Sequence, residues 1–230
     1  MTTVLGLFAK PPVPGTVKTR LAAEIGNEAA ASLYQAFVAD LVQSHTSSAD
    51  IRILGFCGDE REVSETWAQT VACDNFQAWA QPAGDLGQRM YAFFQHALTL
   101  GDRAVLIGTD SPNLPPEYID RAFALLLEHD VVIGPASDGG YYLIGQRSSA
   151  RDIFRDTEWS STRVFEQTAD HVRQFGAGLA LLPVWYDVDT IDDARILWAH
   201  LKATSTTAIP APRTRQQLQT LFEGNPPVTP

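Results

Sequence analysis

The sequence predicts an α/β fold in which a mostly parallel central sheet carries helices on both faces. Short apolar runs alternate with helical patterns along nearly the whole chain, and several of these runs are apolar at almost every position, as strands buried on both faces are. The composition agrees, since 45% of the 230 residues are hydrophobic and 19% are charged, which suffices for a full core and lacks the signature of disorder. We expect one large domain.

The first half of the chain predicts three strands, each followed by a helix. A long loop rich in proline and glycine separates the first strand from its helix. The strands are predicted at Val4–Phe8, at Arg52–Cys57 and, as a weaker pattern, at Phe76–Ala80. The helices are predicted from the spacing of Leu33, Phe37 and Leu41, from the polar pattern of Glu62–Thr70, and from Met90, Phe94 and Ala97.

The second half continues the alternation, with two strands close together. The apolar strand AVLIG ends at Gly108, and a helix at about Pro116–Glu128 leads into VVIGPA, which two glycines separate from YYLIG. A helix with Val164, Thr168 and Val172 precedes the run LALLPVWY, and a last helix carries Ile191, Ala194, Leu197 and Leu201. Thr190 and Asp193 have the spacing of a capping box for that last helix.

The composition changes after Lys202. The segment ATSTTAIPAPRT reads as a linker, and it is followed by one short helix and the tail GNPPVTP, which we expect to be flexible. The sequence therefore predicts a folded domain over residues 1–202, with linker, short helix and tail over 203–230.

The charge and residue spacing exclude several classes of function. A formal net charge of −10 argues against nucleic acid or an anionic membrane as a partner, because both require a clustered excess of Lys and Arg. The histidines lack zinc-binding spacing, and Cys57 and Cys73 resemble ordinary thiols of a reducing compartment. Without a leader-like start or an apolar run of membrane length, we expect a cytoplasmic protein.

Three loops that follow strands contain the unusual residues, and we expect them to meet in one cleft at the carboxyl edge of the sheet. In the first, Lys10–Arg20, the positive charges of Lys10, Lys18 and Arg20 surround a backbone made irregular by Gly15 and several prolines. This loop could cradle phosphates, or it could be a surface loop with solvated cations. It is not a Walker loop, because Val17 stands where that motif requires glycine.

The other two loops carry carboxylates. Asp110, in GTDSP, is well placed to hold Mg²⁺ or Mn²⁺, although it could instead cap a turn. Asp187 and Asp189, in DVDT, are two residues apart, so on an extended backbone both could reach one cation, or one could do so while the other is structural. The alternative for this segment is simple N-capping by Asp189 or Thr190.

A glycine-containing segment, GDLGQRM, adds a further candidate site. Gly84 and Gly87 would let the backbone approach a flat ring closely, and Arg89 lies in the first turn of a helix whose N-terminus favours anions. The alternative is a plain turn with Asp85 as the N-cap.

In SDGGYYLIG, Asp138 precedes Gly139 and Gly140. These glycines either direct backbone N–H groups at a substrate or form a tight hairpin turn.

Six segments taken together resemble the DUF2064 family of bacterial GT-A-type transferases, which is also described as radical-SAM/selenodomain-associated transferase 1. The segments are LFAKPPVPGTVKTRL, GDLGQRM, IGTDSPNLP, VIGPASDGGYYLIG, EWSSTRVFEQT and YDVDTIDDA. They occur in the family's order over about Val4 to Leu201. The family is related more distantly to 2-phospho-lactate guanylyltransferase and to molybdenum-cofactor nucleotidyltransferases.

This resemblance implies a GT-A nucleotide-diphospho-sugar transferase fold with a nucleotide and a divalent cation, Mg²⁺ or Mn²⁺, at the strand ends. It implies phosphate contacts from Lys10, Lys18 and Arg20, base contacts along Gly84, Asp85 and Gly87, metal ligation by Asp110 and by Asp187 or Asp189, and a second substrate facing Asp138, Gly139 and Gly140. The LxAGxGxRM loop of sugar nucleotidyltransferases is replaced by PGTVKTRL, so pyrophosphorylase-like activity is not implied. The motif WSST has an extra serine, and no role is transferred to Ser160 or Ser161.

These expectations lead to one main hypothesis, a metal-dependent transferase that moves a glycosyl group from a nucleotide-diphospho-sugar to a small-molecule acceptor. Asp110, Lys18 and Asp138 would be its catalytic residues, with Asp138 as a candidate base. The same arrangement would also serve nucleotidyl transfer to a small phosphorylated acceptor. A hypothesis from another class is a non-catalytic nucleotide-binding module.

Overall fold

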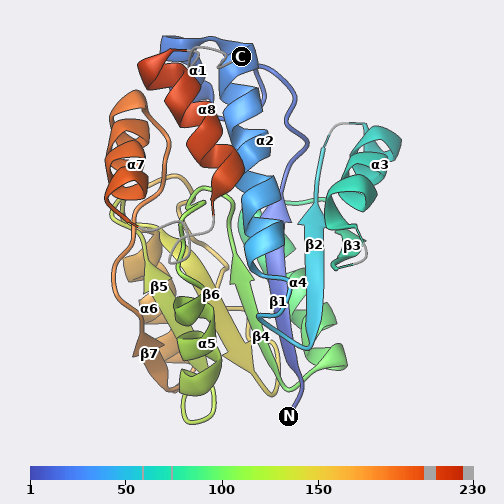
Figure 1. Cartoon of the computed structure of the whole chain (residues 1–230). Coiled ribbons are helices and arrows are strands. Elements are labelled where there is room, and N and C mark those ends of the chain that lie inside the picture. Colours follow the sequence, from blue (N-terminus) through green and yellow to red (C-terminus); the bar gives the residue numbers. More distant parts are fainter. Residues whose placement is uncertain (59, 74, 205–210, 225–230) are drawn as a thin grey trace.

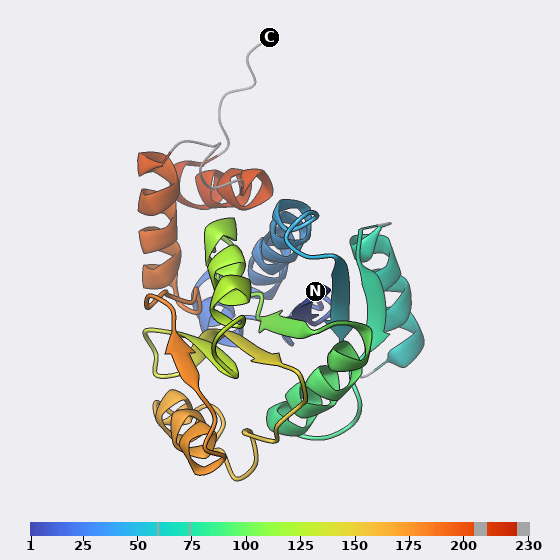
Figure 2. The ribbon, with the colours of Figure 1, turned by 90° about the horizontal axis from the view of Figure 1, so that it is seen from below.

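The computed structural model describes residues 1–58, 60–73, 75–204 and 211–224. A seven-stranded sheet lies between layers of helices, which confirms the predicted α/β class (Figures 1 and 2). The strands are β1 (Thr3–Ala9), β2 (Ile51–Phe56), β3 (Gln77–Ala80), β4 (Arg103–Ile107), β5 (Val131–Pro135), β6 (Tyr141–Arg147) and β7 (Leu179–Leu181). The helices are α1 (Thr19–Ile25), α2 (Asn27–Ser44), α3 (Arg61–Ala72), α4 (Leu86–Leu100), α5 (Pro116–Leu125), α6 (Val164–Gln174), α7 (Ile191–Ala203) and α8 (Pro212–Glu223).

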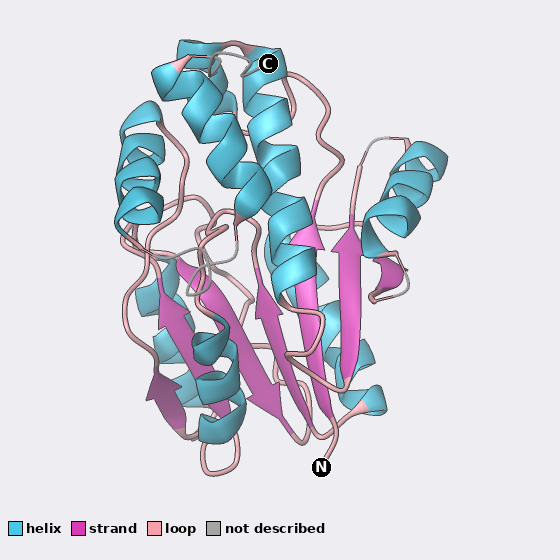
Figure 3. Ribbon diagram, viewed as in Figure 1, coloured by secondary structure: helices cyan, strands magenta, loops and turns pink. Residues whose placement is uncertain are grey.

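The sheet has the strand order β3-β2-β1-β4-β6-β5-β7. All neighbouring strands are parallel except β6, which runs antiparallel to both β4 and β5 (Figure 3). The carboxyl ends of β1, β2, β4 and β5 therefore share one edge, and the hairpin turn from β5 into β6 lies at that same edge. This is the edge at which open α/β sheets bind ligands.

Each face of the sheet is buried under helices, because apolar side chains occupy both sides of the central strands. Leu5 and Leu7 of β1 pack in one cluster with residues of α2, α3 and α5, and Val4 packs in another with residues of α4 and α6. Gly6 faces the second layer, where a Cβ atom would lie 2.3 Å from the ring of Phe93. The missing side chain lets α4 approach the sheet closely.

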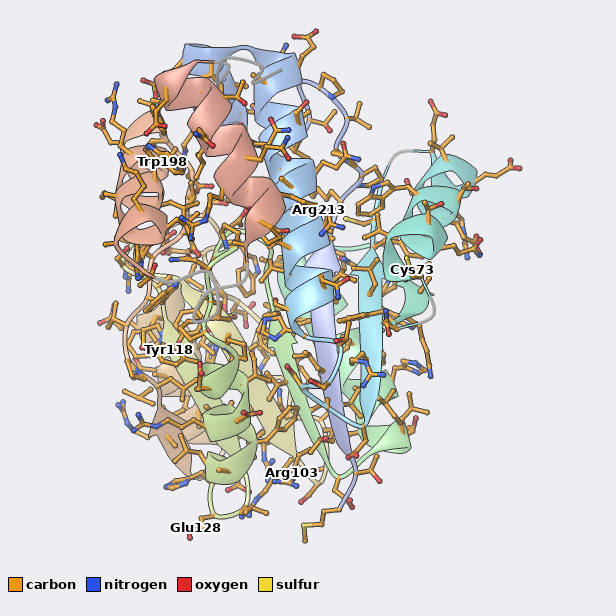
Figure 4. The ribbon with its side chains drawn as sticks, in the orientation of Figure 1. Cys73, Arg103, Tyr118, Glu128, Trp198 and Arg213 are labelled. Carbon is orange, nitrogen blue, oxygen red and sulfur yellow. The ribbon has the colours of Figure 1, made fainter. Side chains whose placement is uncertain are left out.

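A third apolar cluster lies among helices beyond the carboxyl edge. It joins α1, α2, α7 and α8 through residues such as Phe37, Leu197 and Leu218. Helix α8 packs along α2 (Figure 1), and Arg213 at its start lies next to α2 (Figure 4). Half of the expected linker, residues 205–210, and the expected tail after Gly224 lie outside the described residues, and the domain boundary at residue 202 remains a prediction.

Three details differ from or refine the predicted elements. Helix α1 was not predicted; it begins at Thr19, inside the predicted loop Lys10–Arg20, and only Leu21 and Ala22 of its residues are buried. The run LALLPVWY forms just three residues of β7 and one isolated bridge at Trp185, since Pro183 has no N–H for the ladder. The capping box of Thr190 and Asp193 at the start of α7 is confirmed.

Within the described residues, no helix combines the length and the apolar character needed to cross a membrane.

Candidate active site

A cavity of about 460 Å³ opens at the carboxyl edge between the ends of β1 and β4. Its walls come from the loop after β1, the segment after β4, the start of α4, and β6. Six of the predicted site residues line this cavity: Lys10, Lys18, Arg20, Arg89, Asp110 and Asp189. The cavity therefore brings together residues from four segments that are far apart in the sequence.

Lys18 lies at the centre of the charged part of the cavity. It is the residue before α1, its backbone is left-handed with φ 48° and ψ 46°, and its side chain is 3% exposed. Its ammonium group donates hydrogen bonds to Asp110 Oδ1 and, over 2.9 Å, to Asp189 Oδ1. Burial alone would lower the pKa of Lys18, but the two carboxylates outweigh that effect and raise the pKa above its ordinary value, so this lysine is charged.

The loops that carry these carboxylates are joined through their backbones. The N–H of Val188 donates to the carbonyl oxygen of Asp110 over 2.9 Å. The hydroxyl of Ser111 lies 2.7 Å from Asp187 Oδ1 and 3.0 Å from the carbonyl oxygen of Tyr186. These contacts fix the segment after β4 against the segment before α7, and they place Asp110 beside Asp189.

Asp187 and Asp189 have different surroundings, although they are only two residues apart. Asp189 lines the cavity and contacts Lys18, whereas Asp187 is absent from the cavity wall and accepts its hydrogen bond from Ser111. Burial raises the pKa of Asp187 to about 6, and the charges of Asp110 and Asp138 add to this shift. Asp187 and Asp189 lie outside the strands of the sheet. The alternation of side chains along a strand therefore does not fix the directions in which they point.

The remaining basic residues of the first loop lie at the rim. Arg20 is 71% exposed, and its Nη1 lies 3.7 Å from Asp189 Oδ2. The backbone N–H of Lys10 donates over 3.1 Å to the hydroxyl of Tyr34, which lies 3.0 Å from Thr109 Oγ1. Lys10 and Arg20 both line the cavity, where their positive charges can face an anion.

The other end of the cavity is formed by Arg89 and its partners. Arg89 Nη1 lies 3.3 Å from both Cys57 Sγ and Gln81 Oε1, and its Nε donates to the carbonyl oxygen of Asp85. Four of the residues that line the cavity were not predicted as site residues: Tyr34, Cys57, Gln81 and Thr109. Cys57 and Gln81 directly follow β2 and β3, so the rule that placed Asp110 at the carboxyl edge would also have found them.

The predicted base-contacting residues lie beside the cavity, outside its wall. Asp85 caps α4, where its side chain accepts from the N–H of Gln88 over 2.8 Å and Gln88 accepts from the N–H of Asp85 over 3.0 Å. A Cβ atom at Gly87 would lie 2.8 Å from the ring of Trp159, so internal packing explains this glycine. Gly84, with φ 131°, belongs to the turn before the cap, and Gly15 also lies outside the wall.

The segment around Asp138 forms the hairpin turn between β5 and β6. Asp138 Oδ1 accepts from the N–H of Gly140 over 2.8 Å. Gly139 has φ 94°, and a Cβ atom there would lie 2.2 Å from the carbonyl oxygen of Thr162. The exposed Asp138 does not line the cavity, but its charge contributes to the raised pKa of Asp187.

The carboxylates of the cavity fit a divalent cation that arrives with a ligand. The described residues contain no cluster of three or more His, Cys, Asp or Glu suited to a metal ion. Asp110 and Asp189 nevertheless share one cation already, the ammonium of Lys18, and their side chains are 48% and 37% exposed. Mg²⁺ is commonly held by one or two carboxylates together with substrate phosphates and water, and this pair meets that requirement.

The strand order, the helices on both faces of the sheet and the cavity at its carboxyl edge match the fold of nucleotide-diphospho-sugar transferases and nucleotidyltransferases. The sequence model of the family "Uncharacterized protein conserved in bacteria (DUF2064)" matches residues 42–161. A crystal structure from Desulfovibrio desulfuricans G20, provisionally assigned as a nucleotide-diphospho-sugar transferase, is 34% identical over 95% of each chain with a TM-score of 0.86. This chain belongs to the DUF2064 family.

Other solved structures share the fold at much lower identity. A 4-diphosphocytidyl-2C-methyl-D-erythritol synthase from Anaerococcus prevotii DSM 20548 is 9% identical, with 87% of this chain and 99% of that chain covered and a TM-score of 0.56. Rv0371c from Mycobacterium tuberculosis H37Rv is 17% identical, with 86% and 97% covered and a TM-score of 0.51. No curated protein matches this chain by sequence.

Proposed function

We propose that this protein is a nucleotide-dependent transferase that moves a glycosyl group from a nucleotide-diphospho-sugar to a small-molecule acceptor. The observation that supports this proposal most directly is the cavity at the carboxyl edge, where Lys18, Asp110 and Asp189 meet next to two rim cations. A protein with a net charge of −10 needs such a local cluster to hold a diphosphate. The family relative from D. desulfuricans carries a provisional assignment of the same class.

The basic residues of the first loop would bind the diphosphate. Lys10 and Arg20 are exposed at the rim and can turn inward, while Lys18 lies below them in the cavity. Arg89 and Gln81 lie at the other end of the cavity, where their side chains offer hydrogen bonds to a nucleoside. The donor would therefore lie along the cavity between these two groups.

A divalent cation, Mg²⁺ or Mn²⁺, would be held by Asp110 and Asp189. When bound, it would neutralise the charge that develops on the leaving diphosphate. Asp187 would position this pair, because its hydrogen bond to Ser111 joins the two loops that carry the ligands. The structure thus favours Asp189 over Asp187 as the second ligand.

The acceptor would approach from the β5–β6 hairpin turn. Asp138 is exposed and lies near Asp187, so it is the candidate base for an acceptor hydroxyl. Gly139 and Gly140 would shape this side of the site. All residues with a proposed role lie within the predicted domain 1–202.

The experiment is a turnover assay with a panel of nucleoside triphosphates and nucleotide-diphospho-sugars, in Mg²⁺, in Mn²⁺ and in EDTA. Release of a nucleoside diphosphate in the presence of metal supports glycosyl transfer, while release of pyrophosphate would replace it with nucleotidyl transfer. Nucleotide-induced thermal stabilisation that persists in EDTA, without turnover of any donor, would instead identify a non-catalytic binding module.

Asp110→Asn tests the assigned cation ligand. We expect it to abolish metal-dependent nucleotide binding in calorimetry while the circular dichroism spectrum is unchanged, because the neutral carboxamide lacks the negative charge that attracts a divalent cation. The matched control is Asp170→Asn on α6, where the carboxylate pairs with Arg173 on the surface. Equal nucleotide affinity in the two variants would contradict the assignment of Asp110.

A further inference from the structure

The position that a cation would take between Asp110 and Asp189 is filled by a side chain of the protein itself. Lys18 Nζ contacts an oxygen of each carboxylate, and it lies 5.8 Å from the centre of the Phe37 ring. The other side chains of this loop that bear positive charge are at the rim. Lys18 is therefore the resident cation of the carboxylate pair.

The backbone of Lys18 holds it there at a conformational cost. Left-handed backbone is uncommon for residues other than glycine, and such strained residues are concentrated at functional sites. A buried ion pair is weak evidence of a contribution to stability, because apolar side chains of similar size often serve the core as well. The arrangement around Lys18 thus calls for an explanation other than stability.

A divalent cation and the Lys18 ammonium cannot both occupy this position. They carry charges of the same sign, and they would use the same two carboxylates. The divalent cation can bind only if Lys18 withdraws, and a withdrawn ammonium needs a new anionic partner. A diphosphate in the adjacent cavity would supply that partner.

We propose that Lys18 is a built-in competitor of the divalent cation, and that a diphosphate relieves this competition by drawing the ammonium away from Asp110 and Asp189. Cation and diphosphate then bind cooperatively, and the cation alone binds weakly. This inference rests on the proposed function for the identity of the diphosphate. The inference adds that the divalent cation and the diphosphate each raise the affinity of the site for the other.

The test measures Mn²⁺ binding by calorimetry, with and without inorganic pyrophosphate, and corrects for Mn²⁺ bound to free pyrophosphate. In the wild-type protein we expect pyrophosphate to raise the affinity for Mn²⁺ at least tenfold. Lys18→Met removes the ammonium but keeps an unbranched side chain that reaches as far as the lysine Cε, so it should bind Mn²⁺ alone at least tenfold more tightly than the wild type. Its affinity for Mn²⁺ should then gain less from pyrophosphate than that of the wild type, because only the direct contacts between Mn²⁺ and the phosphates remain.

The matched control is Lys10→Met, which removes one positive charge from the same loop and the same cavity without touching either carboxylate. We expect its affinity for Mn²⁺ alone to stay near that of the wild type. In the double variant Lys18→Met/Asp110→Asn, the tighter binding of Mn²⁺ that Lys18→Met alone produces should disappear. If Lys18→Met fails to fold by circular dichroism, Lys18→Gln takes its place.

The proposal is overturned if the Lys18 variant binds Mn²⁺ no more tightly than the Lys10 variant. It is also overturned if pyrophosphate does not change the affinity of the wild type for Mn²⁺, a result that needs no variant. Failure of the proposed function alone gives a different result. No donor would then be turned over, while Lys18 and pyrophosphate would still change the affinity for Mn²⁺ as described. Turnover without any effect of Lys18 on Mn²⁺ would reject this inference alone.

Discussion

Asp40→Asn tests how α8 is attached to the rest of the protein. Asp40 lies on α2 and is fully buried. Its carboxylate accepts from the backbone N–H groups of Arg213 over 3.2 Å and of Thr214 over 2.7 Å, at the start of α8. The residue before that helix, Ala211, provides no side-chain cap. Asp40 therefore caps α8 from another helix.

The size of the effect follows from these two bonds. A hydrogen bond to a charged acceptor contributes about 1.5 to 3 kcal/mol. Asp40→Asn keeps one acceptor oxygen and turns an NH₂ group toward the other N–H, so we expect a loss of about 2 to 3 kcal/mol in the free energy of unfolding. That is a substantial part of the roughly 5 to 15 kcal/mol that stabilises a typical protein.

The assay combines urea unfolding with amide hydrogen exchange, since α8 could open before the whole chain unfolds. We expect faster exchange at α8 in the Asp40→Asn protein, including the amide of Thr214. The control is Asp192→Asn, whose carboxylate pairs with Arg195 on the surface and should matter little. If the two variants are equally stable and their α8 amides exchange alike, the capping argument is refuted.

Two further predictions concern stability. Burial lowers the pKa of His45 to about 4 from 6.5, so between these values the unfolded chain binds the additional proton, and the contribution of His45 to stability should fall by up to about 3 kcal/mol as the pH is lowered. His45→Leu should remove this contribution from the pH dependence of urea-unfolding curves; the same pH dependence in the variant and the wild type would contradict it. Gly139→Ala should lower the melting temperature more than Gly26→Ala. Both glycines have positive φ, but of the two only Gly139 faces a backbone oxygen, that of Thr162. Equal falls in melting temperature would contradict a role for this oxygen.

The order and type of the elements could be predicted from the sequence because most of them bury a clear apolar pattern. β1, β4 and β5 are apolar at nearly every position and buried on both faces. Helix α1 escaped prediction because only two of its residues are buried, so it has no periodic apolar face. Its place is set by the third cluster, in which Leu21 packs against residues distant in the sequence.

The meeting of Asp110 and Asp189 could also be predicted, since it depends only on which edge of the sheet a loop occupies. Which of Asp187 and Asp189 lines the cavity could not be predicted, because the direction of each side chain depends on its contact with Ser111 or Lys18. Nor does the sequence reveal that Lys18 is buried, because that depends on a left-handed backbone at a residue other than glycine.

The reversed direction of β6 has a consequence for how this architecture can diversify. Because β6 enters the sheet from the carboxyl edge, the turn before it, residues 136–140, is tied to its surroundings by few backbone contacts, chiefly those of Ser137 with Trp185 and of Gly139 with Phe165. Insertions there would change the rim while leaving the pairing of β1, β2 and β4 untouched. Related proteins could thus exchange one reaction partner for another by lengthening a single loop.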